Sequence, residues 1–382
     1  MKKSLLALAL LGAFTASAFA EPSVTLYGRI DTGLVYTHKN LDNTAGSTDT
    51  FSMDSGVTTG SRWGLKGSED IGNAKVGFVL ESGFNSDDGT SGQNNRLFGR
   101  EAQVNVSGAY GTLYAGRLAS IASDAGSIGY LGDVSAFPNG FGIVGTQKGS
   151  TGTAYDRYDN TLAYQTPTFG GLQGAIMYSF KGDTKASDTN VANARENSGD
   201  ADRYLAAGLR YKAGKAAVVL TGDMTMYSNV YSNDVHNVYH DVDNGYSFIL
   251  GGNYDFGVAK VFAKATYFDN QVNVIDSFSL IKDARALSTP QALALKGWGA
   301  ELSTAVPAFG GTFLGTVGYR DAKDVDNSSY KFKRWNAAVG YSYAFSKRTN
   351  VYAAAGYAQE KANELDRKAS AAQAGFGLVH KF

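Results

Sequence analysis

The sequence predicts an all-β fold: a transmembrane antiparallel β-barrel of about sixteen strands. Three observations predict it. Apolar and polar residues alternate along most of the chain. The connections between these alternating stretches are short turns and long polar segments in alternation, and a secretory signal precedes all of them. Closure into a barrel follows because hydrocarbon offers no hydrogen-bond partner to the unpaired backbone groups of a sheet edge.

Residues 1–20 are predicted to be a signal peptide, and 21–382 one barrel domain. Lys2 and Lys3 precede a short apolar core, and an A-x-A cleavage site ends at Ala20. The chain has no cysteine, which excludes disulfides and thiolate metal sites. Basic and acidic residues number 35 each, so composition gives no reason to expect a nucleic-acid partner.

The first strands show the alternation most clearly. In 24–36, Arg29 and Asp31 share the polar face opposite a row of aliphatic residues, and in 74–86 Lys75 and Glu81 do the same. Charged groups need water and the opposite face is apolar. We therefore expect a wet lumen inside the barrel and lipid against its outer face.

Sixteen segments carry the strand pattern, with the short turns at one end of the barrel and the long loops, such as 181–202, 228–245 and 270–296, at the other. The predicted strands are 24–36, 53–67, 74–86, 97–107, 112–118, 159–166, 172–180, 203–212, 215–227, 246–255, 259–269, 297–306, 312–321, 333–345, 349–359 and 371–382. A soluble β-sandwich is the alternative, because short alternating strands also build sandwiches. The signal peptide and the aromatic content, 12%, favour the barrel.

Several stretches together resemble a known family. "VTLYGRIDTG", "SRWGLKGSEDIG", "RLFGREAQVNVSGAYGTLYAGR", "YDNTLAYQTPTFGGL" and the terminal "GLVHKF" are similar to the general porins of Gram-negative bacteria, of the beta-proteobacterial and neisserial type. The resemblance implies a homotrimer in the cell outer membrane, in contact with lipid and lipopolysaccharide. It also implies passive diffusion of ions and small hydrophilic solutes through the lumen, without a cofactor.

The last strand carries a possible assembly signal. Phe376, Leu378, His380 and Phe382 share one face at a period of two. In the resembled family, a terminal strand that ends in Phe is read by the barrel-assembly machinery, and His380 is the polar departure from that pattern. The simpler interpretation is a lipid-facing closing strand, and both can hold.

The resemblance also implies a constriction. The loop after strand five, about 119–158, is expected to fold into the lumen opposite a basic wall formed by Arg29, Arg62 and Arg100. Asp124, Asp133 and Asn139 belong to this loop, and the two acids would offset the positive charge of the wall if they reached the throat. Asn139 and Gln165 stand where enterobacterial relatives carry a glutamate and an arginine. Bases without an opposing carboxylate concentrate anions, so modest anion selectivity is predicted.

Strand parity supports these positions unevenly. Arg62 and Lys66 share the face opposite Trp63, which places both in the lumen together with Lys75 and Glu81. Arg100 instead shares its parity with Val104, so either the folded loop covers an apolar wall there or Arg100 faces a subunit contact. Arg117 has the same parity problem, and an interface or loop-anchoring role is expected for it.

Other functions are less well supported. An outer-membrane enzyme would need a Ser/His or Asp/His constellation, and the four dispersed histidines offer none. His236 and His240 lie four apart, but in an expected loop, so no metal site is predicted. A substrate-specific channel remains an alternative, as does an adhesin that binds through loops 228–245 and 270–296.

Overall fold

The computed structural model describes residues 23–44, 46–137, 141, 157–185, 194–228, 243–272, 274, 278, 280–287 and 293–382. The predicted signal peptide, Asn139, His236 and His240 lie outside these residues. The strands are β1 (Ser23–Asn40), β2 (Ser47–Ser55), β3 (Arg62–Asp70), β4 (Ala74–Gly83), β5 (Glu101–Gly108), β6 (Gly111–Ala119), β7 (Arg157–Gln165), β8 (Leu172–Ser179), β9 (Arg203–Ala213), β10 (Ala216–Met226), β11 (Gly245–Asp255), β12 (Lys260–Gln271), β13 (Leu295–Ala308), β14 (Gly311–Asp324), β15 (Lys331–Ala344), β16 (Thr349–Ala362) and β17 (Arg367–Lys381).

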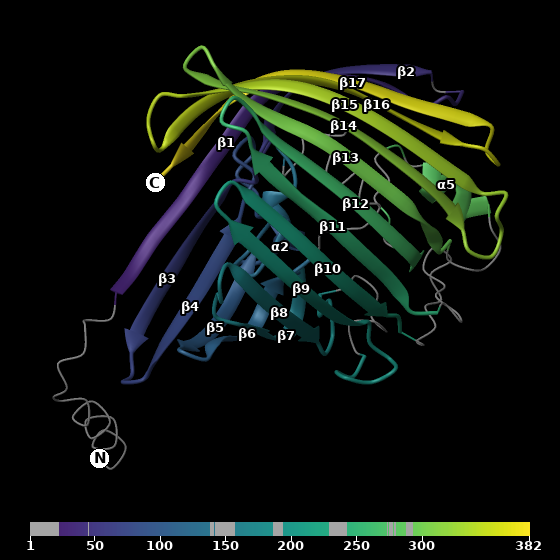
Figure 1. Cartoon of the computed structure of the whole chain (residues 1–382). Coiled ribbons are helices and arrows are strands. Elements are labelled where there is room, and N and C mark those ends of the chain that lie inside the picture. The colour runs from purple at the N-terminus through teal and green to yellow at the C-terminus, as the bar shows by residue number, and fades with distance from the viewer. Residues whose placement is uncertain are drawn as a thin grey trace, which may run out of the picture.

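These strands form one closed antiparallel barrel (Figure 1). Apart from β2 and β3, which do not pair with each other, consecutive strands pair, and β1 pairs with β17 from Arg29↔Lys381 to Asn40↔Ser370. Since β2 and β3 both pair with the other edge of β1, they share one place in the barrel. The predicted sixteen-strand barrel is therefore confirmed, with its second strand split in two.

The split at 56–61 was not predicted, and Asp31 explains it. The Asp31 carboxylate accepts hydrogen bonds from the backbone N–H groups of Thr58 (2.9 Å) and Thr59 (2.8 Å) and from the Tyr352 hydroxyl (2.6 Å). Gly56 opens the interruption with a φ of +70°, a backbone angle that favours glycine. The segment thus leaves the ladder and turns into the lumen to satisfy a buried charge.

The two faces of the sheet differ as the alternation predicts. Val24, Leu26, Leu250 and Val339 are exposed on the outside, where a barrel in a membrane meets lipid. Aromatic side chains gather near the short turns, including the Phe313–Tyr341 pair with ring centroids 4.7 Å apart. Among the residues that the structure describes, no helix is both long and apolar enough to cross a membrane.

The loop after β6 folds into the barrel, as expected. Its buried residues Ile121, Ile128, Leu131 and Val134 pack against the inner wall in one apolar cluster. The wall has room for the loop because it carries a glycine there: a Cβ added to Gly251 would lie 2.8 Å from the Val134 side chain. Farther along, Ser135 donates to Glu301 on β13, so the loop crosses from β6 to the opposite wall.

A second segment also fills the lumen. The loop between β12 and β13 forms α5 (Leu280–Leu287), which lies near the ends of β13–β16 in Figure 1. Phe278, Ile281 and Ala284 are fully buried in a cluster with Phe332 of β15 and Ala358 of β16. The two inserted segments cover part of the inner wall with apolar side chains, a feature that the sequence did not indicate.

Candidate functional site

The three predicted basic-wall residues lie together in the lumen. Arg29 comes from β1, Arg62 from the start of β3, and Arg100 from the residue before β5. Thr59, in the interruption between β2 and β3, accepts hydrogen bonds through Oγ1 from Arg29 Nη1 (3.1 Å) and Arg62 Nη2 (3.3 Å). The split strand therefore holds two guanidiniums side by side against their mutual repulsion.

Glu81 is the carboxylate within this group. Its Oε1 accepts from Arg100 Nε at 2.7 Å and lies 3.7 Å from Arg62 Nη1, and its Oε2 accepts from the Tyr27 hydroxyl at 3.1 Å. Glu81 contacts two of the three guanidiniums, and Arg29 forms no ion pair among the described residues, so the group keeps a positive excess. Because the side chains of Arg62, Arg100 and Glu81 are largely buried, water screens this excess less than it would at an open surface.

Arg100 contradicts the parity argument. The structure places it just before the ladder of β5, where its backbone N–H donates to Glu81 O (3.1 Å) and its guanidinium turns inward. Gly60 leaves room for that guanidinium, since an added Cβ would lie 3.1 Å from Nη1. Val104 of the same parity is exposed on the outer face, so neither of the two expected explanations applies.

Arg117 takes the loop-anchoring arrangement. Its Nε donates to Gly99 O (2.8 Å), and its Nη1 donates to Arg157 O (3.3 Å) and to Asp159 Oδ1 (2.5 Å). A bulge lies opposite Arg117: Gly116 pairs with Thr161 and Leu118 with Tyr158, so β7 carries one extra residue there.

The loop acids lie away from the three arginines. Asp133 pairs with Lys212 at the end of β9 (2.7 Å), and its carbonyl accepts from Asn253 of β11 (2.7 Å). Asp124 acts electrostatically on Arg157 and Lys264. Neither acid forms an ion pair with Arg29, Arg62 or Arg100 among the residues described.

The remaining lumen candidates occupy different places. Lys66 is exposed, with its ammonium 5.3 Å from the centre of the Tyr27 ring. Lys75 pairs with Asp70 beside a short turn (3.5 Å). Gln165 donates to the hydroxyl of Tyr130 in the inserted loop (3.3 Å), so it supports the loop from the wall.

The terminal strand presents its apolar side outward. Phe376, Leu378 and Phe382 are all exposed, and the His380 ring hydrogen-bonds Thr349 Oγ1 (2.9 Å). Phe382 exchanges backbone hydrogen bonds with Gly28 on β1, and its ring covers the place of a Gly28 side chain.

Two features of the site were not predicted from the sequence. The role of Thr59 depends on the strand interruption, for which only Gly56 and Gly60 give a local signal. Arg157, at the start of β7, is close enough to Arg62 and Arg100 for their charges to interact, yet it lies at the end of a long loop that carried no pattern. Within the described ranges, no cluster of three or more His, Asp or Glu residues is arranged to hold a metal.

Comparison with known proteins places this geometry in a family. Residues 7–363 match the sequence profile of the Gram-negative porins. The chain is 35% identical to an outer membrane porin protein of Bordetella pertussis and 30% identical to the major outer membrane protein P.IB of Neisseria meningitidis, over the full length of both chains in each case. The chain belongs to the Gram-negative porin family.

Solved structures agree with this porin fold. The anion-selective porin from Comamonas acidovorans superposes with a TM-score of 0.62 at 22% identity, covering 95% of this chain and 100% of that one. The trimer form of OmpT, an outer membrane protein of Vibrio cholerae, superposes with a TM-score of 0.64 at 15% identity, covering 95% and 100%. The protein is an outer-membrane porin, and its family and fold are those of a channel rather than an enzyme.

Proposed function

We propose that this porin is a diffusion channel that prefers anions, and that Arg29, Arg62 and Arg100 set the preference. The observation that carries the proposal is that, among the described residues, Glu81 is the one carboxylate in an ion pair with this group, to Arg62 and Arg100, while Asp133 of the loop pairs with Lys212 instead. The anion selectivity named for the Comamonas acidovorans porin supports it.

The expected size of the effect follows from Coulomb's law. An ion that passes about 5 Å from one unit charge in water gains about 0.8 kcal/mol, which is about fourfold in local concentration. We expect a reversal potential toward that of chloride under a KCl gradient in planar bilayers. Arg62→Gln should lower the chloride-to-potassium permeability ratio at least about twofold.

The matched control is Lys75→Gln, which removes the same charge at the exposed Lys75–Asp70 pair and should leave the ratio unchanged. Cation preference in the wild type, or an equal effect of both substitutions, would contradict the assignment of the throat. Absence of any conductance would instead favour the adhesin alternative.

Three further expectations belong to the same proposal. We infer that residues 1–20 are removed on export, which mass spectrometry of the outer-membrane form tests. We infer a homotrimer, which the OmpT trimer form supports and light scattering of the purified protein tests. Contact of the outer face with lipid and lipopolysaccharide follows from its exposed apolar side chains.

We also propose that Phe376, Leu378 and Phe382 are read by the barrel-assembly machinery. Their outward position on the last strand supports this role. Phe382→Ala should reduce the amount of folded porin in the outer membrane while the purified chain still refolds in detergent. Equal loss in both assays would show that Phe382 acts on stability alone.

A further inference from the structure

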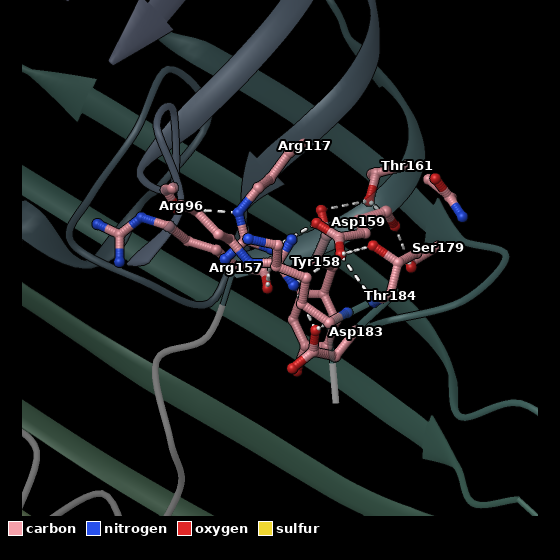
Figure 2. Close-up of polar contacts among 12 residues, drawn as sticks. Arg96, Arg117, Arg157, Tyr158, Asp159, Thr161, Ser179, Asp183 and Thr184 are labelled. Atoms are coloured by element: carbon pink, nitrogen blue, oxygen red, sulfur yellow. Dashed lines mark hydrogen bonds and ion pairs between the residues drawn. The ribbon is translucent and has the colours of Figure 1, made fainter. Parts of the chain in front are cut away.

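A second group of arginines lies beside the constriction, at the loop ends of β6 and β7. A cavity of about 380 Å³ is found there. Its lining includes Arg96, Arg117, Arg157 and Arg203, together with Asp183 and Asp202. Figure 2 shows Arg96, Arg117 and Arg157 gathered around Asp159.

Asp159 organises one side of the cavity. Its Oδ1 accepts from Arg117 Nη1 (2.5 Å), and its Oδ2 lies 3.1 Å from Arg96 Nη2. The same Oδ2 accepts from the backbone N–H (2.8 Å) and the hydroxyl (2.7 Å) of Thr184. These four contacts fill the acceptor capacity of a carboxylate. Asp159 is therefore fully used in holding Arg96 and Arg117.

The other acids of the lining are also engaged. Asp183 forms an ion pair with Arg96, and Asp202 Oδ1 accepts the backbone N–H of Ser228 at 2.6 Å. Burial raises the pKa of Asp202, which lies in the loop before β9.

Arg157 and Arg203 each keep a hydrogen-bond donor that no described residue accepts. The Nε atom of each is buried, and neither has a hydrogen-bond partner for it among the described residues. Neither side chain forms an ion pair within the same residues. A buried donor without an acceptor costs free energy, which an acceptor arriving in the cavity would recover. Tyr158 and Tyr204, stacked with ring centroids 3.8 Å apart, add a flat wall nearby.

We propose that this cavity binds a small oxyanion, a phosphate or carboxylate group, through Arg157 and Arg203, before the solute reaches the constriction. The planar guanidinium matches the paired oxygens of these groups, which a simple halide lacks. Arg96 and Arg117 are already paired with Asp159 and Asp183, so the positive excess of the cavity comes from Arg157 and Arg203. The inference rests on the proposed function only in that the solute arrives through an anion-preferring lumen.

The test is calorimetric titration of the purified, full-length porin in detergent with inorganic phosphate, and separately with succinate. We expect saturable binding of at least one of the two anions, and the responding anion identifies the preferred group. Arg157→Gln combined with Arg203→Gln should weaken that binding at least about tenfold. If the double variant does not assemble, Arg203→Gln alone serves, with an expected loss of several-fold.

Two controls separate this site from the constriction. Arg195→Gln removes an exposed arginine, paired with Asp200 in the same loop region, and should leave binding unchanged. Arg62→Gln should shift the reversal potential but keep the binding.

Three results would overturn the inference: no saturable binding by the wild type, equal binding by the arginine variants, or loss of binding in Arg62→Gln, which would place the anion at the constriction. A wild type without anion preference that still binds phosphate or succinate would refute the proposed function and leave this site standing.

Discussion

A row of buried charges under α5 allows the effect of a substitution on the free energy of unfolding to be predicted. Arg320, Arg334 and Glu360 lie directly opposite one another on β14, β15 and β16. The Arg320 guanidinium donates to Glu360 at 2.5 Å, and both side chains are 0% exposed. The Arg334 guanidinium lies 5.1 Å from the centre of the Phe278 ring, in the segment that covers the row.

Glu360→Gln breaks the buried ion pair between Glu360 and Arg320. Removing one partner of a buried ion pair costs about 3–5 kcal/mol, because the remaining charge stays out of water. The matched control is Lys333→Gln, in a pair that joins β14 and β15. It breaks the Lys333–Asp321 pair (3.3 Å), whose side chains are 48% and 32% exposed, and should cost about 0–1 kcal/mol.

The assay is urea unfolding of each refolded variant in lipid vesicles, followed by tryptophan fluorescence and by the mobility of the folded barrel on gels. We expect the free energy of unfolding to fall by about 3 kcal/mol or more in Glu360→Gln relative to Lys333→Gln. A difference within about 1 kcal/mol would refute the reasoning. It would mean that lumen water reaches the row despite the covering α5 segment.

Further outcomes are expected elsewhere. Ile281→Asp should release α5 from the wall, because a carboxylate replaces a fully buried apolar side chain, and raise the single-channel conductance; the neighbouring exposed Lys282→Gln should leave it unchanged. Thr59→Val removes the acceptor shared by the two constriction guanidiniums and should reduce anion preference in the KCl-gradient assay, while Thr90→Val in an exposed loop should not. Gly28→Ala should destabilise the barrel by about 1–3 kcal/mol in urea, because the added Cβ would lie 2.7 Å from a backbone oxygen of β3 and 2.4 Å from the Phe382 ring; wild-type stability would show that both can move aside.

The extent to which the sequence predicted the site varies from residue to residue. Alternation placed Arg29, Arg62 and Glu81 on the lumen face, because the two-residue period of a strand is a local property. It misplaced Arg100, which stands one residue outside its ladder. No local pattern marked the residue at which β5 begins, so parity counted along the strand did not apply to Arg100.

The inserted segments show the same limit. Length and polarity identified the loops at 119–158 and 270–296, but not that apolar residues such as Ile121 and Ile281 pack on the inner wall. The wall positions that receive them include Gly251 and several alanines, which the sequence alone does not distinguish from ordinary strand residues. Only the curvature of the closed barrel brings plug and wall together.

The sequence by itself determined the barrel, the number of its strands, the place of most of them, the end at which the long loops gather and the polar identity of the lumen face. These follow from hydrophobic periodicity, turn lengths and the need to pair every backbone group in a membrane. The tertiary structure alone decided which charges meet. The Thr59 contact with Arg29 and Arg62, the row from Arg320 to Glu360 and the cavity around Asp159 each join strands or loops whose neighbourhood is set by register and closure. Register and closure are cooperative properties of all the strands at once, so no single stretch of sequence contains them.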